Sequence, residues 1–254
     1  MKKIIIFLLF ISISVLSFSQ ELKFGMQITG TASWLLNKQM FDDGHAQDPV
    51  ASSFGEYFGP SVTFKFPKPV SMLGVELGLN FNVINQKYKG DIELFGVQTS
   101  YNHYESSLKY KSVDIPIMLI VGKKIYFEFG GVVHVRGKVR YNRTFEKTDI
   151  ESSFGKYNNT TYACLNVTDE SVESAFKKSA FGWAIGVGAD LNLPLNFVLN
   201  VGLRVNYIPN DMEGINGLML SKNFYSSKSE DFKNFYTKPI YGGIRIGLRY
   251  KLSL

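Results

Sequence analysis

The last strand-length stretch of the chain, residues 240–252, alternates between apolar and polar positions. Isoleucine, leucine and tyrosine occupy one parity, while Arg245, Gly247 and Arg249 fall on the other. A period of two over this length indicates a β-strand with one apolar and one polar face. Seven earlier segments repeat the pattern, namely 22–34, 56–66, 72–84, 109–121, 125–141, 179–193 and 196–208. The repetition predicts an all-β fold.

The connections between these segments alternate in length. Short turns follow 56–66, 109–121 and 179–193, and long polar connections follow the other strands. Outer-membrane β-barrels have short turns on the periplasmic side and long loops outside. We therefore predict a closed, antiparallel, up-and-down transmembrane β-barrel of eight strands in the bacterial outer membrane, with both termini in the periplasm. A ten-stranded barrel that uses part of 142–178 is the structural alternative.

Overall composition gives no hint of a membrane protein. Apolar residues make up 45% of the chain, and the mean hydropathy is −0.02. Barrel strands produce such averages because lipid-facing and lumen-facing residues alternate. A soluble lipocalin-like barrel would instead put its apolar residues inside, around a ligand. Such a barrel has no reason to gather its long loops at one end, so we favour the membrane alternative.

Aromatic residues on the apolar parity lie near the strand ends, as expected where a barrel crosses the two membrane interfaces. The set at the short turns is Phe24, Phe66, Phe127, Phe197 and Tyr250. The set at the long loops is Trp34, Phe58, Phe81, Tyr141, Phe181, Trp183 and Tyr207.

The first 19 residues are distinct from the barrel. Lys2 and Lys3 precede an apolar run over 4–16, and the small residues Ser17 and Ser19 follow it. A basic start, an apolar middle and a small-residue exit predict a secretory signal peptide over 1–19 and a barrel domain over 20–254. The apolar run is shorter than the roughly 20 residues of a spanning helix, and a retained anchor is the alternative.

The inward parity of the predicted barrel carries charges of both signs. An eight-stranded barrel is filled by its own side chains, and buried charges are costly unless they are paired. We therefore predict a salt-bridged interior in which inward glycines make room for long arginines. Its members are Lys65, Glu76, Asp114, Glu128, His134, Arg136, Asp190, Arg204, Arg245 and Arg249. We place Arg204 and Arg245 nearer the long loops than Glu76 and Glu128.

The sequence offers weak patterns for catalysis or ligand binding. His45 lies among aspartates without the ligand spacing of a calcium loop, and the glycines of 182–188 precede no helix that could complete a phosphate loop. We expect no enzyme activity, no cofactor and no metal. The net charge of +6 is spread out, so nucleic acid is not an expected partner. An outer-leaflet lipid-modifying enzyme using His45 or His103 is an alternative.

Two motifs resemble known patterns. Tyr110-x-x-Val113-Asp114-Ile115-Pro116-Ile117-Met118-Leu119 is similar to the fourth strand of PorT-like outer-membrane β-barrel proteins. The set Arg245, Gly247, Tyr250 and Leu252 resembles the C-terminal signal read by the barrel-assembly machinery, although the chain ends in Leu254 and not in phenylalanine. The PorT-like resemblance implies an outer-membrane barrel, and some members of that family are accessory parts of a protein secretion system.

We expect a structural or interaction role exercised through the long outer loops, which are rich in aromatic residues. The expected partners are outer-membrane lipid and lipopolysaccharide, the barrel-assembly machinery during insertion, and a protein bound at the loops. A narrow channel for ions or small solutes is the alternative function.

Overall fold

The computed structural model describes residues 21–37, 48–49, 53–67, 69–94, 101–147, 154–157, 160–163, 166–210, 212 and 237–253. The predicted signal peptide, His45 and Cys164 lie outside these ranges. The main strands are β1 (Glu21–Asn37), β3 (Ser53–Lys65), β4 (Leu73–Gly78), β5 (Asn80–Leu94), β6 (Tyr101–Gly122), β7 (Ile125–Phe145), β11 (Ser179–Asn192), β12 (Phe197–Tyr207) and β13 (Thr237–Ser253).

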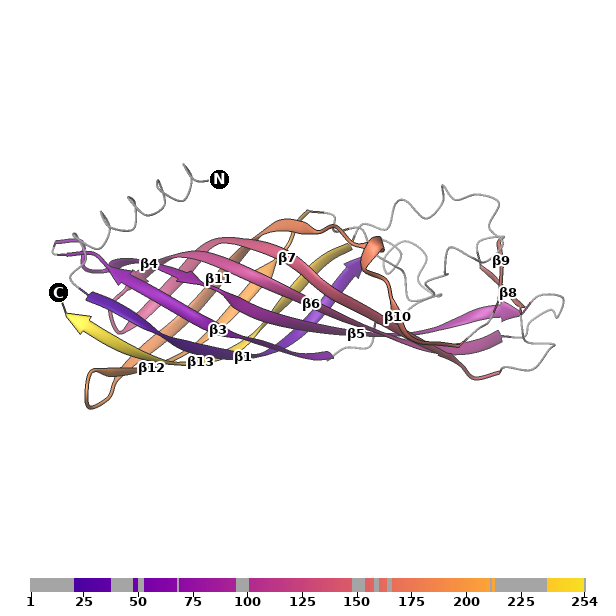
Figure 1. Ribbon diagram of the computed structural model, residues 1–254, viewed down its shortest axis with the longest axis horizontal. Helices are drawn as coiled ribbons and strands as arrows, with labels where there is room; N and C mark the ends of the chain where they lie inside the picture. The colour runs from indigo at the N-terminus through magenta and orange to yellow at the C-terminus, as the bar shows by residue number, and fades with distance from the viewer. Residues whose placement is uncertain are drawn as a thin grey trace.

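These strands close into one ring (Figure 1). Each pairs antiparallel with the next along the chain, and β13 returns to pair with all 17 residues of β1. β4 and β5 continue each other on either side of Leu79, and β3 pairs with both. Counted as one, they give a ring of eight strands within the described residues. The predicted closed, antiparallel, up-and-down barrel is therefore confirmed.

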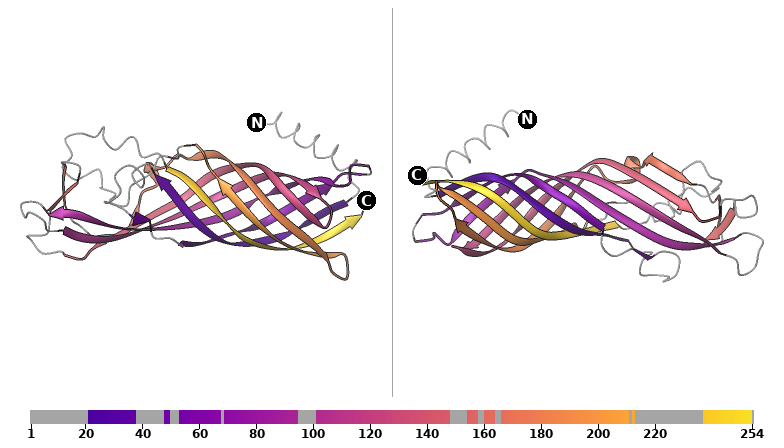
Figure 2. Two further views of the ribbon diagram at one scale, coloured as in Figure 1. Left: turned by 180° about the vertical axis from the view of Figure 1, so that it is seen from behind. Right: turned by 90° about the horizontal axis from the view of Figure 1, so that it is seen from below.

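The remaining elements lie at the long-loop end (Figure 2). They are β2 (Asp48–Pro49), β8 (Phe154–Tyr157), β9 (Thr160–Ala163), β10 (Val167–Ser171) and the short 3-10 helix η1 (Glu173–Ala175). β2 and β8 pair with β5, β9 with β8, and β10 with β7. Since these pairings use the distal parts of β5 and β7, the described parts of 142–178 add no strand to the ring.

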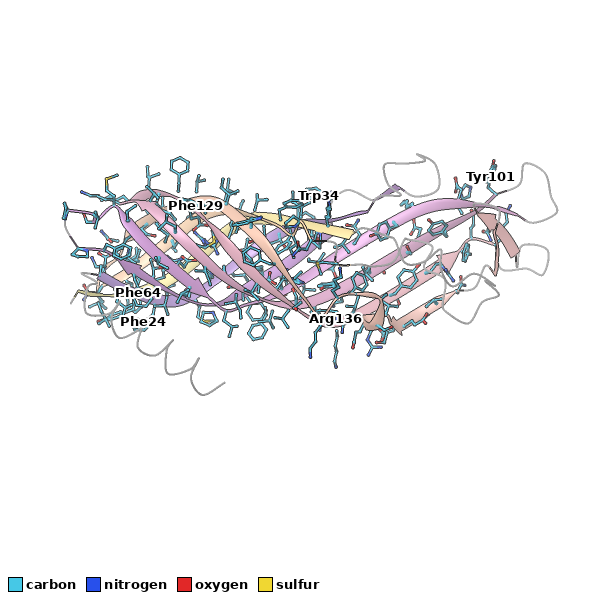
Figure 3. All side chains as sticks on the ribbon, turned by 90° about the horizontal axis from the view of Figure 1, so that it is seen from above. Phe24, Trp34, Phe64, Tyr101, Phe129 and Arg136 are labelled. Carbon is cyan, nitrogen blue, oxygen red and sulfur yellow. The ribbon has the colours of Figure 1, made fainter. Side chains whose placement is uncertain are left out.

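The two faces of the barrel have opposite chemistry. Outward side chains are apolar: Leu203 and Ile246 are 52% and 49% exposed. Inward Arg204 and Arg245 are 2% and 0% exposed. Figure 3 shows Phe24, Phe64 and Phe129 on the outside of the barrel. Apolar groups around a closed cylinder with a polar interior are the arrangement of a transmembrane barrel.

Aromatic rings contact one another along the outside at the short-turn end. Phe24, Phe197 and Tyr250 belong to adjacent strands, and the ring of Tyr250 lies 5.7 Å from Phe24 and 5.5 Å from Phe197. Such a band suits the membrane interface, where aromatic rings are enriched. Within the described ranges, no helix is long and apolar enough to cross a membrane.

Three strands continue past the ring and form an extension at the long-loop end. Pairing of β5 with β6 runs to Glu93 and Tyr101, and pairing of β6 with β7 runs to Tyr104 and Phe145. Figure 3 shows Tyr101 near the far end of this extension. The strands predicted over 72–84 and 109–121 were therefore too short, because much of the polar stretch between them continues these strands as a hairpin, with Tyr88, Tyr104 and Leu108 buried on one face.

A β-bulge in β7 corrects one predicted face. Tyr110 pairs with Val139, but Ser112 pairs with Arg136, so β7 has one extra residue at Gly137 and Lys138. An extra residue inverts the alternation beyond it. Val139 and Tyr141 are therefore fully buried inside and not lipid-facing as predicted. The same inversion turns Lys138 and Arg140 outward, and it removes Tyr141 from the predicted loop-side aromatic set.

Candidate functional site

A charge cluster crosses the middle of the lumen. Glu76 of β4, Glu128 of β7, Arg204 of β12, and Arg245 and Arg249 of β13 converge there, all at most 2% exposed. They come from strands on different sides of the ring. Each points inward because its position has the inward parity of a regular strand. We call these five residues the central cluster.

Arg204 joins the two carboxylates of the central cluster. Its Nε donates to Glu128 Oε1 at 2.6 Å, and its Nη2 donates to Glu76 Oε1 at 2.7 Å. Arg245 Nη2 lies 3.0 Å from Glu128 Oε2, and Arg249 Nη2 lies 2.7 Å from Glu76 Oε2. Charge-assisted bonds of this length are strong. They hold opposite walls of the barrel together.

These contacts correct the predicted depths. Arg204 and Arg245 contact Glu76 and Glu128 directly, so the four lie at one level and not at two. The shear of a tilted barrel brings residues at different distances from the turns to the same height. Counting residues from the turns does not include this shear.

The inward glycines of β11 make room for Glu128 and Tyr126, and not for the arginines as predicted. A Cβ on Gly186 would lie 2.5 Å from Glu128 Oε1, and one on Gly188 would lie 2.5 Å from the hydroxyl oxygen of Tyr126. Tyr126 in turn accepts a bond from Arg245 Nη2 at 2.9 Å. The glycines of β11 thus accommodate the side chains that hold the arginines, and not the arginines themselves.

A second group of charges lies at the short-turn end. Lys23 Nζ is 2.7 Å from Asp190 Oδ2 and 2.8 Å from Glu21 Oε1. Lys65 Nζ donates to the carbonyl oxygen of Gly122 at 2.7 Å. The four charged side chains line a cavity of about 300 Å³ at the barrel mouth, together with Phe66, Ser71, Lys123, Lys124, Asn192 and Lys251. The partner of Asp190, Lys23, was not among the predicted interior residues.

A third group surrounds Asp114, nearer the long loops. His134 Nδ1 lies 2.6 Å from Asp114 Oδ1, and the Tyr110 hydroxyl lies 2.9 Å from His134 Nε2. Tyr241 also donates its hydroxyl to Asp114. All four side chains are fully buried. The motif residues Tyr110 and Asp114 thus meet through the histidine of the neighbouring strand, β7.

Arg136 does not join these groups. It is partly exposed, and its Nη1 donates to the carbonyl oxygen of Phe176 at 2.8 Å. It lies next to the β7 bulge, where inward and outward directions change. Arg136 therefore anchors the segment after η1 at the rim and does not pair with an interior carboxylate.

Sequence reasoning missed an apolar group that closes the long-loop end of the lumen, which we call the lumen cap. Its members are Leu35, Tyr57, Ile84, Leu108, Tyr110, Val139, Tyr141, Val172, Phe176, Ile208, Met212 and Tyr241. They come from six strands and from segments next to η1 and after β12. A sequence signal for this group existed: Tyr57, Tyr110 and Tyr241 are aromatic residues at positions of inward, polar parity.

The geometry of these groups suits a stabilising role, because their charged side chains bind one another. The carboxylates of the central cluster are occupied by guanidinium groups, which remain charged at any physiological pH. In the part of the chain that the structure describes, no group of three or more His, Cys, Asp and Glu side chains could hold a metal ion. At the exposed face of the extension, His103 contacts the carboxylate of Asp91.

Sequence comparison assigns this barrel to a family. The model of the family described as "Outer membrane protein beta-barrel domain" matches residues 5–224. The chain belongs to this family. Membership places this outer-membrane barrel protein in the bacterial outer membrane. No curated protein matches the sequence.

Several solved structures resemble the chain, each over most of both lengths. Neisserial surface protein A is 12% identical, with 91% of this chain and 97% of that chain covered and a TM-score of 0.37. Ail of Yersinia pestis is 13% identical, with 92% and 99% covered and a TM-score of 0.35. The outer membrane protease OmpT of Escherichia coli is 10% identical, with 92% and 97% covered and a TM-score of 0.38. Similarities at this level carry no argument about function.

Proposed function

We propose that this outer-membrane barrel is a closed structural and interaction protein, and neither a pore nor an enzyme. The observation that supports this best is the filled lumen. The central cluster crosses its middle, and the lumen cap lies over its long-loop end. An ion entering from either end would meet side chains that already bind one another. Contacts with other molecules are then left to the outside, above all to the extension of β5, β6 and β7.

We infer the orientation from the connections. Short turns and both chain ends lie in the periplasm, and the extension lies outside the cell, as is usual for such barrels. The proposed partners are outer-membrane lipid and lipopolysaccharide, and a protein at the long loops. The barrel-assembly machinery would read Arg245, Gly247, Tyr250 and Leu252 during insertion. The PorT-like resemblance favours a secretion-system partner, and secretion by a strain lacking this chain tests that narrower role.

Planar-bilayer conductance of the purified protein tests the closed lumen. We expect no steady openings, while an open porin in the same bilayer serves as the positive control. Steady openings that change on Arg204→Ala or Arg245→Ala substitution would contradict the proposal and identify a channel. Both arginines are central to the cluster, so a conducting path would have to pass them.

A narrow ion pathway is the second candidate, and one observation favours it. Gln27 Oε1 and the hydroxyls of Thr29 and Thr31 are buried and make no hydrogen bond within the described residues. They follow one another along the lumen wall, and Thr29 is opposite Arg245 in the strand register. If the wild type conducts, Thr29→Val with Thr31→Val should reduce the openings.

The lipid-modifying alternative rests on His103 and its contact with Asp91. Mass spectrometry of outer-membrane lipids from cells with and without the protein tests it. We expect the same lipids in both. A modification that depends on the protein and disappears in His103→Ala would overturn the non-enzymatic proposal.

A further inference from the structure

The outer surface of β5, β6 and β7 changes from apolar to basic within one row of residues. Phe81, Val113 and Val135 are neighbours on the lipid-facing side. In the next outward row toward the extension, Lys111 of β6 is opposite Val83. The surface therefore leaves the acyl region of the membrane at a well-defined level.

The rows beyond that level carry five cations, which we call the basic band. Lys109 is opposite Arg140 of β7, and Lys87 is one row further on β5. Lys138 lies in the β7 bulge beside this surface. The band consists of Lys87, Lys109, Lys111, Lys138 and Arg140, of which the lysines are exposed and Arg140 partly exposed.

The β7 bulge supplies two of these five cations. Without it, the regular alternation would turn Lys138 and Arg140 into the lumen. On β5, β6 and β7, the described outward positions of these rows contain no Asp or Glu, while Glu56 of β3 lies opposite Val83 and continues the row of Lys111. Two further carboxylates lie close by: Asp169, 3.7 Å from Arg140, and Glu105, 3.1 Å from Lys89 one row further out. The band therefore keeps a positive excess.

The band is confined to one side of the barrel. The described outward positions of β1, β3 and β12 hold no lysine or arginine, and β13 contributes only Lys238. A general attraction to the membrane would place cations all around the ring. A one-sided cluster suits a ligand that occupies one place beside the barrel.

We propose that the basic band binds the phosphate groups of a phosphorylated glycolipid of the outer leaflet, with the acyl chains against Phe81, Val113 and Val135. The inference rests on the proposed orientation, which puts the extension outside the cell. Lysine ammonium groups bind phosphates as point charges, and long stems let them reach headgroup depth from apolar surface. The location directly above the apolar rows favours a lipid over a soluble anion.

Native mass spectrometry of the detergent-solubilised protein with lipid A tests this inference. The variant Lys109→Gln/Lys111→Gln/Lys138→Gln removes three charges from the band. The matched control Lys123→Gln/Lys124→Gln/Lys251→Gln removes three lysines at the short-turn end, away from the band. Each lysine near an anionic surface contributes on the order of fivefold in affinity, so binding by the first variant should fall on the order of 100-fold. The control should bind like the wild type.

A second arm needs no variant and separates the sources of the anion. Wild-type protein should bind bisphosphorylated lipid A more tightly than lipid A stripped of phosphate, by at least tenfold. Equal binding of both forms, or equal loss in the two triple variants, would overturn the inference. Preferential binding of a soluble sulfated polysaccharide would also overturn it. Because binding is measured in detergent, its failure is independent of the conductance result and leaves the closed-barrel proposal standing.

Discussion

At the scale of single residues, the central cluster sets three guanidinium groups against two carboxylates. Such an arrangement depends on each carboxylate, because removing one partner leaves a buried charge uncompensated. Glu128 depends on this balance because Arg204 donates to both of its carboxylate oxygens and Arg245 donates to Oε2.

We expect Glu128→Gln to lower the free energy of unfolding by about 3–5 kcal/mol, the usual cost of breaking a buried ion pair. Urea titration in lipid vesicles, followed by tryptophan fluorescence, measures it. Glu105→Gln is the control, because the Glu105 side chain is 73% exposed and its ion pair should contribute little. A cost for Glu128→Gln no larger than the control would contradict the structural role of the cluster.

Gly188→Ala tests the packing behind the same cluster. The added Cβ would lie 2.5 Å from the Tyr126 hydroxyl oxygen and 2.6 Å from its ring. Overpacking of this kind costs about 1–3 kcal/mol. Gly30→Ala is the matched control, since nothing lies within 4 Å of its added Cβ. Equal unfolding midpoints for the two variants would show that Tyr126 does not need this space.

At the scale of the element, β7 shows where a regular strand becomes an irregular one. Its bulge turns Val139 and Tyr141 into the lumen cap and puts Lys138 and Arg140 on the surface. One extra residue thus adds two side chains to the lumen cap and two to the basic band.

Cysteine labelling tests this inversion directly. In a Cys164→Ser background, we expect Arg140→Cys to react with a water-soluble maleimide and Val139→Cys to stay protected, because Val139 is fully buried. Gel-shift assays of the folded protein give the labelled fractions. If Val139→Cys reacted and Arg140→Cys did not, the uninterrupted alternation expected from the sequence would be correct and the bulge wrong.

Comparison of the elements shows what the sequence can and cannot reveal. β13 and β12 follow strict alternation, so their faces and their inward Arg204, Arg245 and Arg249 could be predicted. β7 departs from it at Gly137, and a glycine inside a strand can mark a bulge but does not decide one, since Gly186 and Gly188 lie in regularly paired β11. Lys23 and the lumen cap were missed because lumen partners depend on barrel shear and on segments folded over the rim, which are long-range features.

At the scale of the whole molecule, the barrel is polarised. The described chain ends and the short turns share one end, and the extension occupies the other (Figure 1). The proposed orientation makes these two ends experimentally distinct.

We expect Glu105→Cys, in a Cys164→Ser background, to be labelled by a membrane-impermeant reagent on intact cells. Lys124→Cys, in the short turn after β6, should be labelled only after the outer membrane is permeabilised. Both side chains are exposed, so accessibility within the protein is matched. The reverse pattern would place the extension in the periplasm and contradict the proposed orientation.

The seam between β1 and β13 joins the first and last described strands along the full length of β1. Until the final strand arrives, β1 and β12 each present a row of unsatisfied backbone groups, which hydrocarbon cannot tolerate. The strands of this chain therefore cannot enter the membrane one at a time during synthesis. The chain must reach the outer membrane unfolded and protected from aggregation, and it becomes stable in the membrane only when β13 pairs with β1.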